Sequence, residues 1–139
     1  MDLTPGIITL VQFTGTVIGY LRDINDPSND RKTLLDELLM AHYFLLQLKD
    51  NAQGDPHTWS ETIRSLAITG GPIDQFNKTI KIIKSKLEVG SGIKKIGQAL
   101  KWPFQKAEVQ SLISTLERQK SFFNIALQND HRLGLLCSF

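Results

Sequence analysis

Apolar residues recur every three or four positions along most of the chain, and this spacing predicts amphipathic helices. Three stripes are the clearest: Leu34, Leu38, Ala41, Leu45 and Leu48; Ile73, Phe76, Ile80, Ile83 and Leu87; and Val109, Leu112, Leu116, Phe123 and Leu127. No stretch alternates apolar and polar residues as a half-buried strand does. We therefore expect an all-α fold without a sheet.

Prolines and glycines divide this pattern into about six segments. Thr4-Pro5, Asp26-Pro27 and Asp55-Pro56 each join an N-cap residue to a proline suited to the first helical position. Gly70-Gly71-Pro72 and Gly90-Ser91-Gly92 are breaks between helices. We expect helices over about 5–24, 27–52, 56–68, 72–89 and 105–129, with a short, glycine-interrupted piece at 93–101. Short connections favour an antiparallel bundle of five to six helices, and residues 1–139 form a single domain.

Composition argues for an ordinary folded domain, because 41% of the residues are hydrophobic and 22% are charged. Cys137 is the single cysteine, so an internal disulfide is excluded and a reducing compartment is favoured. Met1-Asp2-Leu3 carries an acid where a secretory signal would have basic residues. We expect a cytoplasmic protein.

Candidate catalytic chemistry is missing from the sequence. His42, His57 and His131 lie on different expected elements and share no metal-ligand spacing with one another or with Cys137. The glycine-rich run at 90–95 is too short for a phosphate-binding loop, and its lysines are not followed by Ser or Thr. We expect no enzyme, metal, cofactor or small-molecule substrate.

The first helix stands out because the nineteen residues 3–21 include no formal charge. At about 1.5 Å per residue such a helix is about 28 Å long, close to the roughly 30 Å of a bilayer's hydrocarbon. Gly15 and Gly19 have the spacing that lets membrane helices pack closely. The alternative is a central helix buried in a soluble bundle, and the two interpretations are compatible if the helix is buried at rest and exposed on activation. The candidate membrane-inserting residues are Ile7, Ile8, Leu10, Val11, Phe13, Val17, Ile18 and Leu21.

A second unusual feature is the concentration of lysines between residues 78 and 106. This stretch has a charge of +7, since Glu88 is its only acid, so the rest of the chain carries −5. Its lysines are Lys78, Lys81, Lys84, Lys86, Lys94, Lys95, Lys101 and Lys106. Lysines near an anionic leaflet each contribute about 1 kcal/mol, although a solvated helix face is an equally good explanation. Trp102 and Phe104 are the only aromatic residues among them, and no recognition motif appears, so we expect no nucleic-acid partner.

Several strings in the chain resemble one family over nearly its whole length. They are the string at 6–20 (GIITLVQFTGTVIGY), Asp30-Arg31-Lys32 followed by Leu34-Leu35, the string at 46–49 (LQLK), the string at 71–76 (GPIDQF), the string at 100–104 (LKWPF) and the string at 126–131 (ALQNDH). The chain resembles the HeLo-like N-terminal domains of fungal STAND proteins, the NOD-like receptors of fungi. These domains are similar to the HET-S HeLo domain and to the four-helix bundle of the necroptotic pseudokinase.

The resemblance implies a cell-death effector that self-associates on activation and releases its N-terminal helix into the plasma membrane. It also implies that Asp2 is the acid often found ahead of that helix, and that basic residues engage anionic lipids. The candidate lipid-binding residues are assigned on charge alone: Lys78, Lys81, Lys84, Lys94, Lys95 and Lys101. The nucleotide-binding domain and repeats of such receptors do not occur in residues 1–139, so we expect an upstream or attached STAND receptor as a partner. The alternative is a non-lytic helical adaptor that makes protein–protein contacts in the same signalling.

Overall fold

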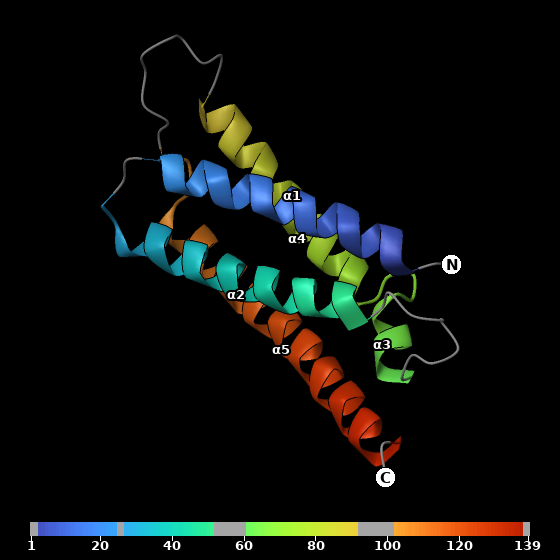
Figure 1. Cartoon of the computed structure of the whole chain (residues 1–139). Coiled ribbons are helices and arrows are strands. Elements are labelled where there is room, and N and C mark those ends of the chain that lie inside the picture. Colours follow the sequence, from blue (N-terminus) through green and yellow to red (C-terminus); the bar gives the residue numbers. More distant parts are fainter. Residues whose placement is uncertain (1–2, 25–26, 52–60, 92–101, 138–139) are drawn as a thin grey trace.

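The computed structural model describes residues 3–24, 27–51, 61–91 and 102–137. Over these ranges the chain forms five helices and no strand, which confirms the all-α prediction (Figure 1). The helices are α1 (Leu3–Asp23), α2 (Asn29–Asn51), α3 (Glu61–Leu66), α4 (Pro72–Ser91) and α5 (Lys106–Cys137).

The four long helices form a bundle made of two hairpins. Within each hairpin, α1 with α2 and α4 with α5, the helices run antiparallel as expected, and Figure 1 shows that α1 and α4 run in the same direction. Among the four long helices, the main contacts join α2 to α5, α1 to α2, α4 to α5 and α1 to α4, so these helices follow one another around the bundle in the order α1, α2, α5, α4. The short α3 packs on α5. Helix α1 therefore occupies a corner of the bundle, with α2 and α4 as its principal neighbours.

The predicted apolar stripes supply the core of the bundle. Every stripe residue of α2 and α4 is less than 9% exposed, and only Leu112 of the α5 stripe is partly buried instead of fully buried. Phe76 of α4 and Phe123 of α5 meet edge to face at a centroid distance of 5.4 Å, a geometry that aromatic pairs favour. The helical period therefore identified the buried face of each of these three helices.

Several helix ends differ from the prediction. Helix α1 begins at Leu3, so Thr4 lies inside the helix and is not its N-cap, and Pro5 is not the first helical residue. Helix α3 ends at Leu66 and not at 68, and α4 ends at Ser91 and not at 89. Helix α2 begins at Asn29 and not at Pro27, because Ser28 provides the cap: its Oγ accepts the backbone N–H of Arg31 at 3.4 Å. Helix α5 continues eight residues past the expected end at 129, to Cys137, since no proline interrupts it. The expected start of the third helix at 56 and the piece at 93–101 lie outside the described residues.

The turn before α4 follows the predicted break. Gly70 has a φ of 77°, a backbone conformation that glycine adopts without steric cost. Its N–H donates to the Asp74 carboxylate at 2.8 Å, which closes the first turn of the helix. At Gly71 an added Cβ would lie 2.7 Å from the Ile68 carbonyl oxygen, so this position has no room for a side chain. Pro72 is the first helical residue, as predicted.

Candidate membrane interface

The eight candidate membrane-inserting residues divide between two environments. Five of them are in the core, Val11 and Phe13 pack against it from the side, and Ile8 is 38% exposed. The five core residues are Ile7, Leu10, Val17, Ile18 and Leu21. Helix α1 is thus anchored by one apolar face and is not enclosed on all sides, contrary to the alternative of a central helix.

The outward face of α1 carries no charge until Arg22. Thr9, Gln12 and Thr16 are exposed there beside Ile8. The outward faces of the neighbouring helices differ, since α2 exposes Lys32 and Asp36. An uncharged face on a corner helix is unusual for a helix that only borders water, where charged residues normally predominate.

Two threonines of α1 are satisfied within the helix itself. The Thr14 hydroxyl donates to the Leu10 carbonyl at 2.7 Å, and the Thr16 hydroxyl donates to the Gln12 carbonyl at 3.1 Å. A hydroxyl bonded to its own helix keeps that bond in any environment, which lowers the cost of placing it in an apolar medium. The exposed Gln12 amide is the main polar group of this face that would need a partner elsewhere.

Two cationic side chains from other helices hold α1 in place, and neither contact was predicted. Arg31 of α2 donates from Nη1 to the Leu21 carbonyl at 3.2 Å, near the C-terminal end of α1 where a positive charge is favourable. The Lys84 ammonium of α4 lies 4.7 Å from the centroid of the Phe13 ring. A candidate lipid-binding lysine and a candidate inserting residue are therefore in contact in the bundle.

The two glycines proposed for helix packing have different surroundings. A Cβ at Gly15 would lie 3.7 Å from His42 Nε2 of α2, an ordinary van der Waals distance. A Cβ at Gly19 would meet no described atom within 4 Å. Neither glycine is required for close approach between the described helices of this bundle.

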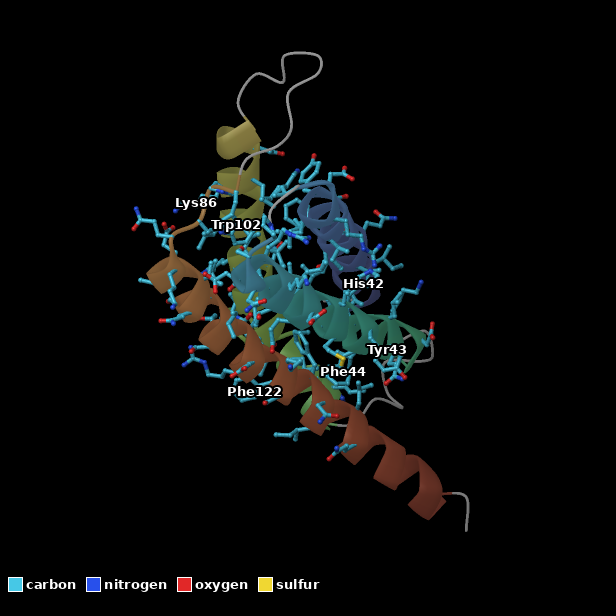
Figure 2. The ribbon with its side chains drawn as sticks, turned by 90° about the vertical axis from the view of Figure 1, so that its left-hand side faces the viewer. His42, Tyr43, Phe44, Lys86, Trp102 and Phe122 are labelled. Atoms are coloured by element: carbon cyan, nitrogen blue, oxygen red, sulfur yellow. The ribbon has the colours of Figure 1, made fainter. Side chains whose placement is uncertain are left out.

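The lysine side chains of α4 point toward three different surroundings: solvent, α1 and α5. Lys78 and Lys81 are exposed on the outer side of α4, while Lys84 is 4.7 Å from the Phe13 ring and 3.5 Å from Glu88. Lys86 forms an ion pair with Glu108 of α5 and lies 5.5 Å above the Phe104 ring. Figure 2 shows it beside Trp102, whose ring is 5.0 Å from that of Phe104. The charge open to a partner is therefore smaller than the sequence total of +7 suggests.

Four other predicted site residues have no described position. Asp2, Lys94, Lys95 and Lys101 lie outside the described residues. Within the ranges that the structure describes, no three His, Cys, Asp or Glu side chains gather as metal ligands. None of the helices in those ranges combines the length and apolarity of a membrane span.

Comparison of the chain with protein-family models, curated proteins and solved structures found no match.

Proposed function

We propose that this domain is a membrane-targeting effector of cell death, in which clustering transfers α1 from the bundle to a membrane that contains anionic lipid. The observation that carries the proposal is the position of α1: a helix at a corner of the bundle that is uncharged from Leu3 to Leu21, with one buried apolar face and an outer face without charge before Arg22. In keeping with the resemblance to fungal HeLo-like domains, the clustering agent would be a STAND receptor. The domain would be cytoplasmic at rest and at the plasma membrane when active.

The free-energy cost of exposing the apolar face of α1 to water favours a helix that moves directly from the protein core to lipid. Exposing a buried apolar side chain to water costs about 1.5–3 kcal/mol, so releasing the five core side chains of α1 into water costs on the order of 10 kcal/mol. A lipid interior would recover most of this cost. The resting bundle should therefore keep α1 packed until lipid is available.

Clustering would provide a hydrogen-bond partner for the polar side chain that a single copy of α1 would carry into the membrane. The Gln12 amide needs a hydrogen-bond partner in an apolar medium, and a neighbouring copy of α1 can provide one. Tethering copies together raises their effective concentration to about the millimolar range. The proposal therefore requires self-association before permeabilisation.

The test is dye release from vesicles of equal parts phosphatidylserine and phosphatidylcholine, with the chain fused to an inducible oligomerisation tag. We expect release only after induction, and a large loss of release for Ile8→Asp, which places a charge on the exposed part of α1. Thr33→Asp is the control, because Thr33 is an exposed residue of α2. Intact vesicles after induction, or equal release by Ile8→Asp and wild type, would exclude the proposal.

A second candidate is the non-lytic adaptor, and exposed residues on α2 favour it. Met40 is 46% exposed and Tyr43 is 54% exposed, and both residue types are enriched in protein interfaces. Figure 2 shows Tyr43 beside Phe44, and their rings lie 6.0 Å apart. An adaptor would keep its activity when Lys94, Lys95 and Lys101 are all changed to Glu, whereas that triple change should weaken the recruitment of a lipid-binding domain to anionic membranes.

A further inference from the structure

Ile82 is one of the most exposed large apolar residues of the described chain, with 58% of its surface accessible, and lysines flank it on α4. Residues three or four apart share a helix face. Lys78 and Lys86 are therefore one turn before and one turn after Ile82, and Lys81 is next to it on the same outer side. A single exposed isoleucine is common on protein surfaces, and Ile82 is distinguished by the lysines that surround it.

A groove between α4 and α5 continues the apolar surface of Ile82. The groove has a volume of about 400 Å³, and its apolar lining includes Ile82, Phe104, Ala107 and Leu112. A shallower depression of about 470 Å³ adjoins it on the α4 side, next to Lys81 and Ser85. The apolar surface is therefore larger than one side chain.

The lysines around Ile82 differ in whether a nearby acid compensates their charge. Lys86 is compensated by Glu108 at the edge of the groove. Lys78 and Lys81 are exposed and have no ion pair with any residue that the structure describes. The open cations thus lie on the side of Ile82 that faces away from the bundle, where a negatively charged surface would meet them.

We infer that the outer side of α4, formed by Ile82, Lys78 and Lys81, is the surface with which the folded bundle docks on an anionic lipid leaflet before α1 moves. Ile82 enters the boundary between headgroups and acyl chains, and the two ammonium groups remain at the level of the headgroups. The inference rests on the proposed function for its choice of a membrane as the partner. It assigns docking to α4 and leaves insertion to α1.

An exposed isoleucine between lysines fits a membrane better than a nucleic acid. Nucleic-acid surfaces use exposed aromatic rings on which bases stack, and Phe104, the ring that lines the groove together with Ile82, is only 6% exposed. The transfer of an isoleucine side chain from water to an apolar medium is favourable. A lipid leaflet provides such a medium and a phosphate backbone does not.

The experiment measures binding of the untagged chain to vesicles by co-sedimentation, with equal parts phosphatidylserine and phosphatidylcholine against phosphatidylcholine alone. Ile82→Ser should weaken binding to the anionic vesicles about five-fold. About half of the isoleucine side chain is exposed to water in the folded protein, so roughly half of its transfer free energy becomes available when it enters the lipid. The double variant Lys78→Glu/Lys81→Glu should weaken it more than twenty-fold, at roughly five-fold for each lysine lost. Added salt should reduce the effect of the two lysine substitutions on binding, because salt screens charges, and should not change the effect of Ile82→Ser.

The chain offers matched controls on other faces. Ile125→Ser removes an isoleucine that is 51% exposed on α5. Lys32→Glu/Arg118→Glu reverses two exposed charges on α2 and α5. Both controls should bind the anionic vesicles within about two-fold of wild type, and all variants change exposed residues, so circular dichroism should show equal helix content.

The outcomes separate this inference from the proposed function. Equal binding by Ile82→Ser and Ile125→Ser would overturn docking by α4, even if clustered protein still releases dye. Binding of wild type to vesicles without dye release after clustering would overturn the proposed function and leave docking intact. No binding to anionic vesicles, or tighter binding to a duplex RNA that competes with them, would also overturn the docking surface.

Discussion

Replacing the glycines of α1 with alanine should stabilise the resting bundle. An alanine at Gly19 would contact no described atom within 4 Å, and an alanine at Gly15 would touch His42 at an ordinary distance of 3.7 Å. No steric cost therefore opposes the gain of about 0.5–1 kcal/mol that alanine offers over glycine in a helix interior. The double variant Gly15→Ala/Gly19→Ala should gain about 1–2 kcal/mol.

The assay is urea and thermal unfolding followed by far-ultraviolet circular dichroism. For a domain of this length the gain corresponds to a rise in Tm of roughly 3–8 °C. The same stabilisation should make α1 harder to release, so induced dye release should need a higher protein concentration. Gly71→Ala is the control with the opposite sign, because its Cβ would lie 2.7 Å from the Ile68 carbonyl oxygen and should destabilise the fold.

One result would refute this reasoning. If Gly15→Ala or Gly19→Ala lowers the free energy of unfolding by more than about 0.5 kcal/mol, the glycines are required for packing in the resting bundle. The account of α1 as a helix weakened by unconstrained glycines would then be wrong.

Three further substitutions test contacts around α1 and in the core. Arg31→Gln should destabilise the bundle by about 1–2 kcal/mol in urea unfolding, because the carbonyl at the end of α1 loses a charged donor; an unchanged midpoint would contradict this role. Phe13→Leu should remove the contact with Lys84 and increase hydrogen exchange of α1 amides by roughly two- to five-fold, and unchanged exchange would show that the contact does not hold α1. Gln119→Met should be neutral or stabilising, because the buried Gln119 amide bonds Thr79 at 3.2 Å through Nε2 while its Oε1 has no partner among the described residues; a loss above about 1 kcal/mol would show that the amide is needed.

Helical periodicity was sufficient to predict the elements and the buried stripes, because each stripe repeats with the period of the helix whatever it packs against. The start of α2 was placed two residues early, because the prediction rested on Asp26-Pro27, whereas the Ser28 hydroxyl caps the helix in the structure. The order of the helices around the bundle was not predicted. It depends on contacts between residues far apart in the chain, which a periodic pattern does not contain.

The candidate site was predicted only in outline. The uncharged run of α1 is visible in the sequence, but the division between buried Val17 and exposed Ile8 depends on where α2 and α4 lie. The lysine total overstated the open charge, because the ion pair of Lys86 with Glu108 joins two helices. Ile82 was assigned no function because it lies outside the apolar stripe of α4, and the periodic pattern identifies only the residues of the stripe.

The most direct test is to follow the environment of α1 while the protein is clustered on a membrane. A fluorophore attached at Ile8→Cys, in a Cys137→Ser background, reports a residue that is 38% exposed in the resting bundle. The account predicts that clustering on anionic vesicles shifts the emission to the blue and makes it sensitive to a quencher carried on the lipid chains. Emission that stays unchanged and unquenched on clustering, with the vesicles still sealed, would contradict the claim that α1 moves from protein to lipid.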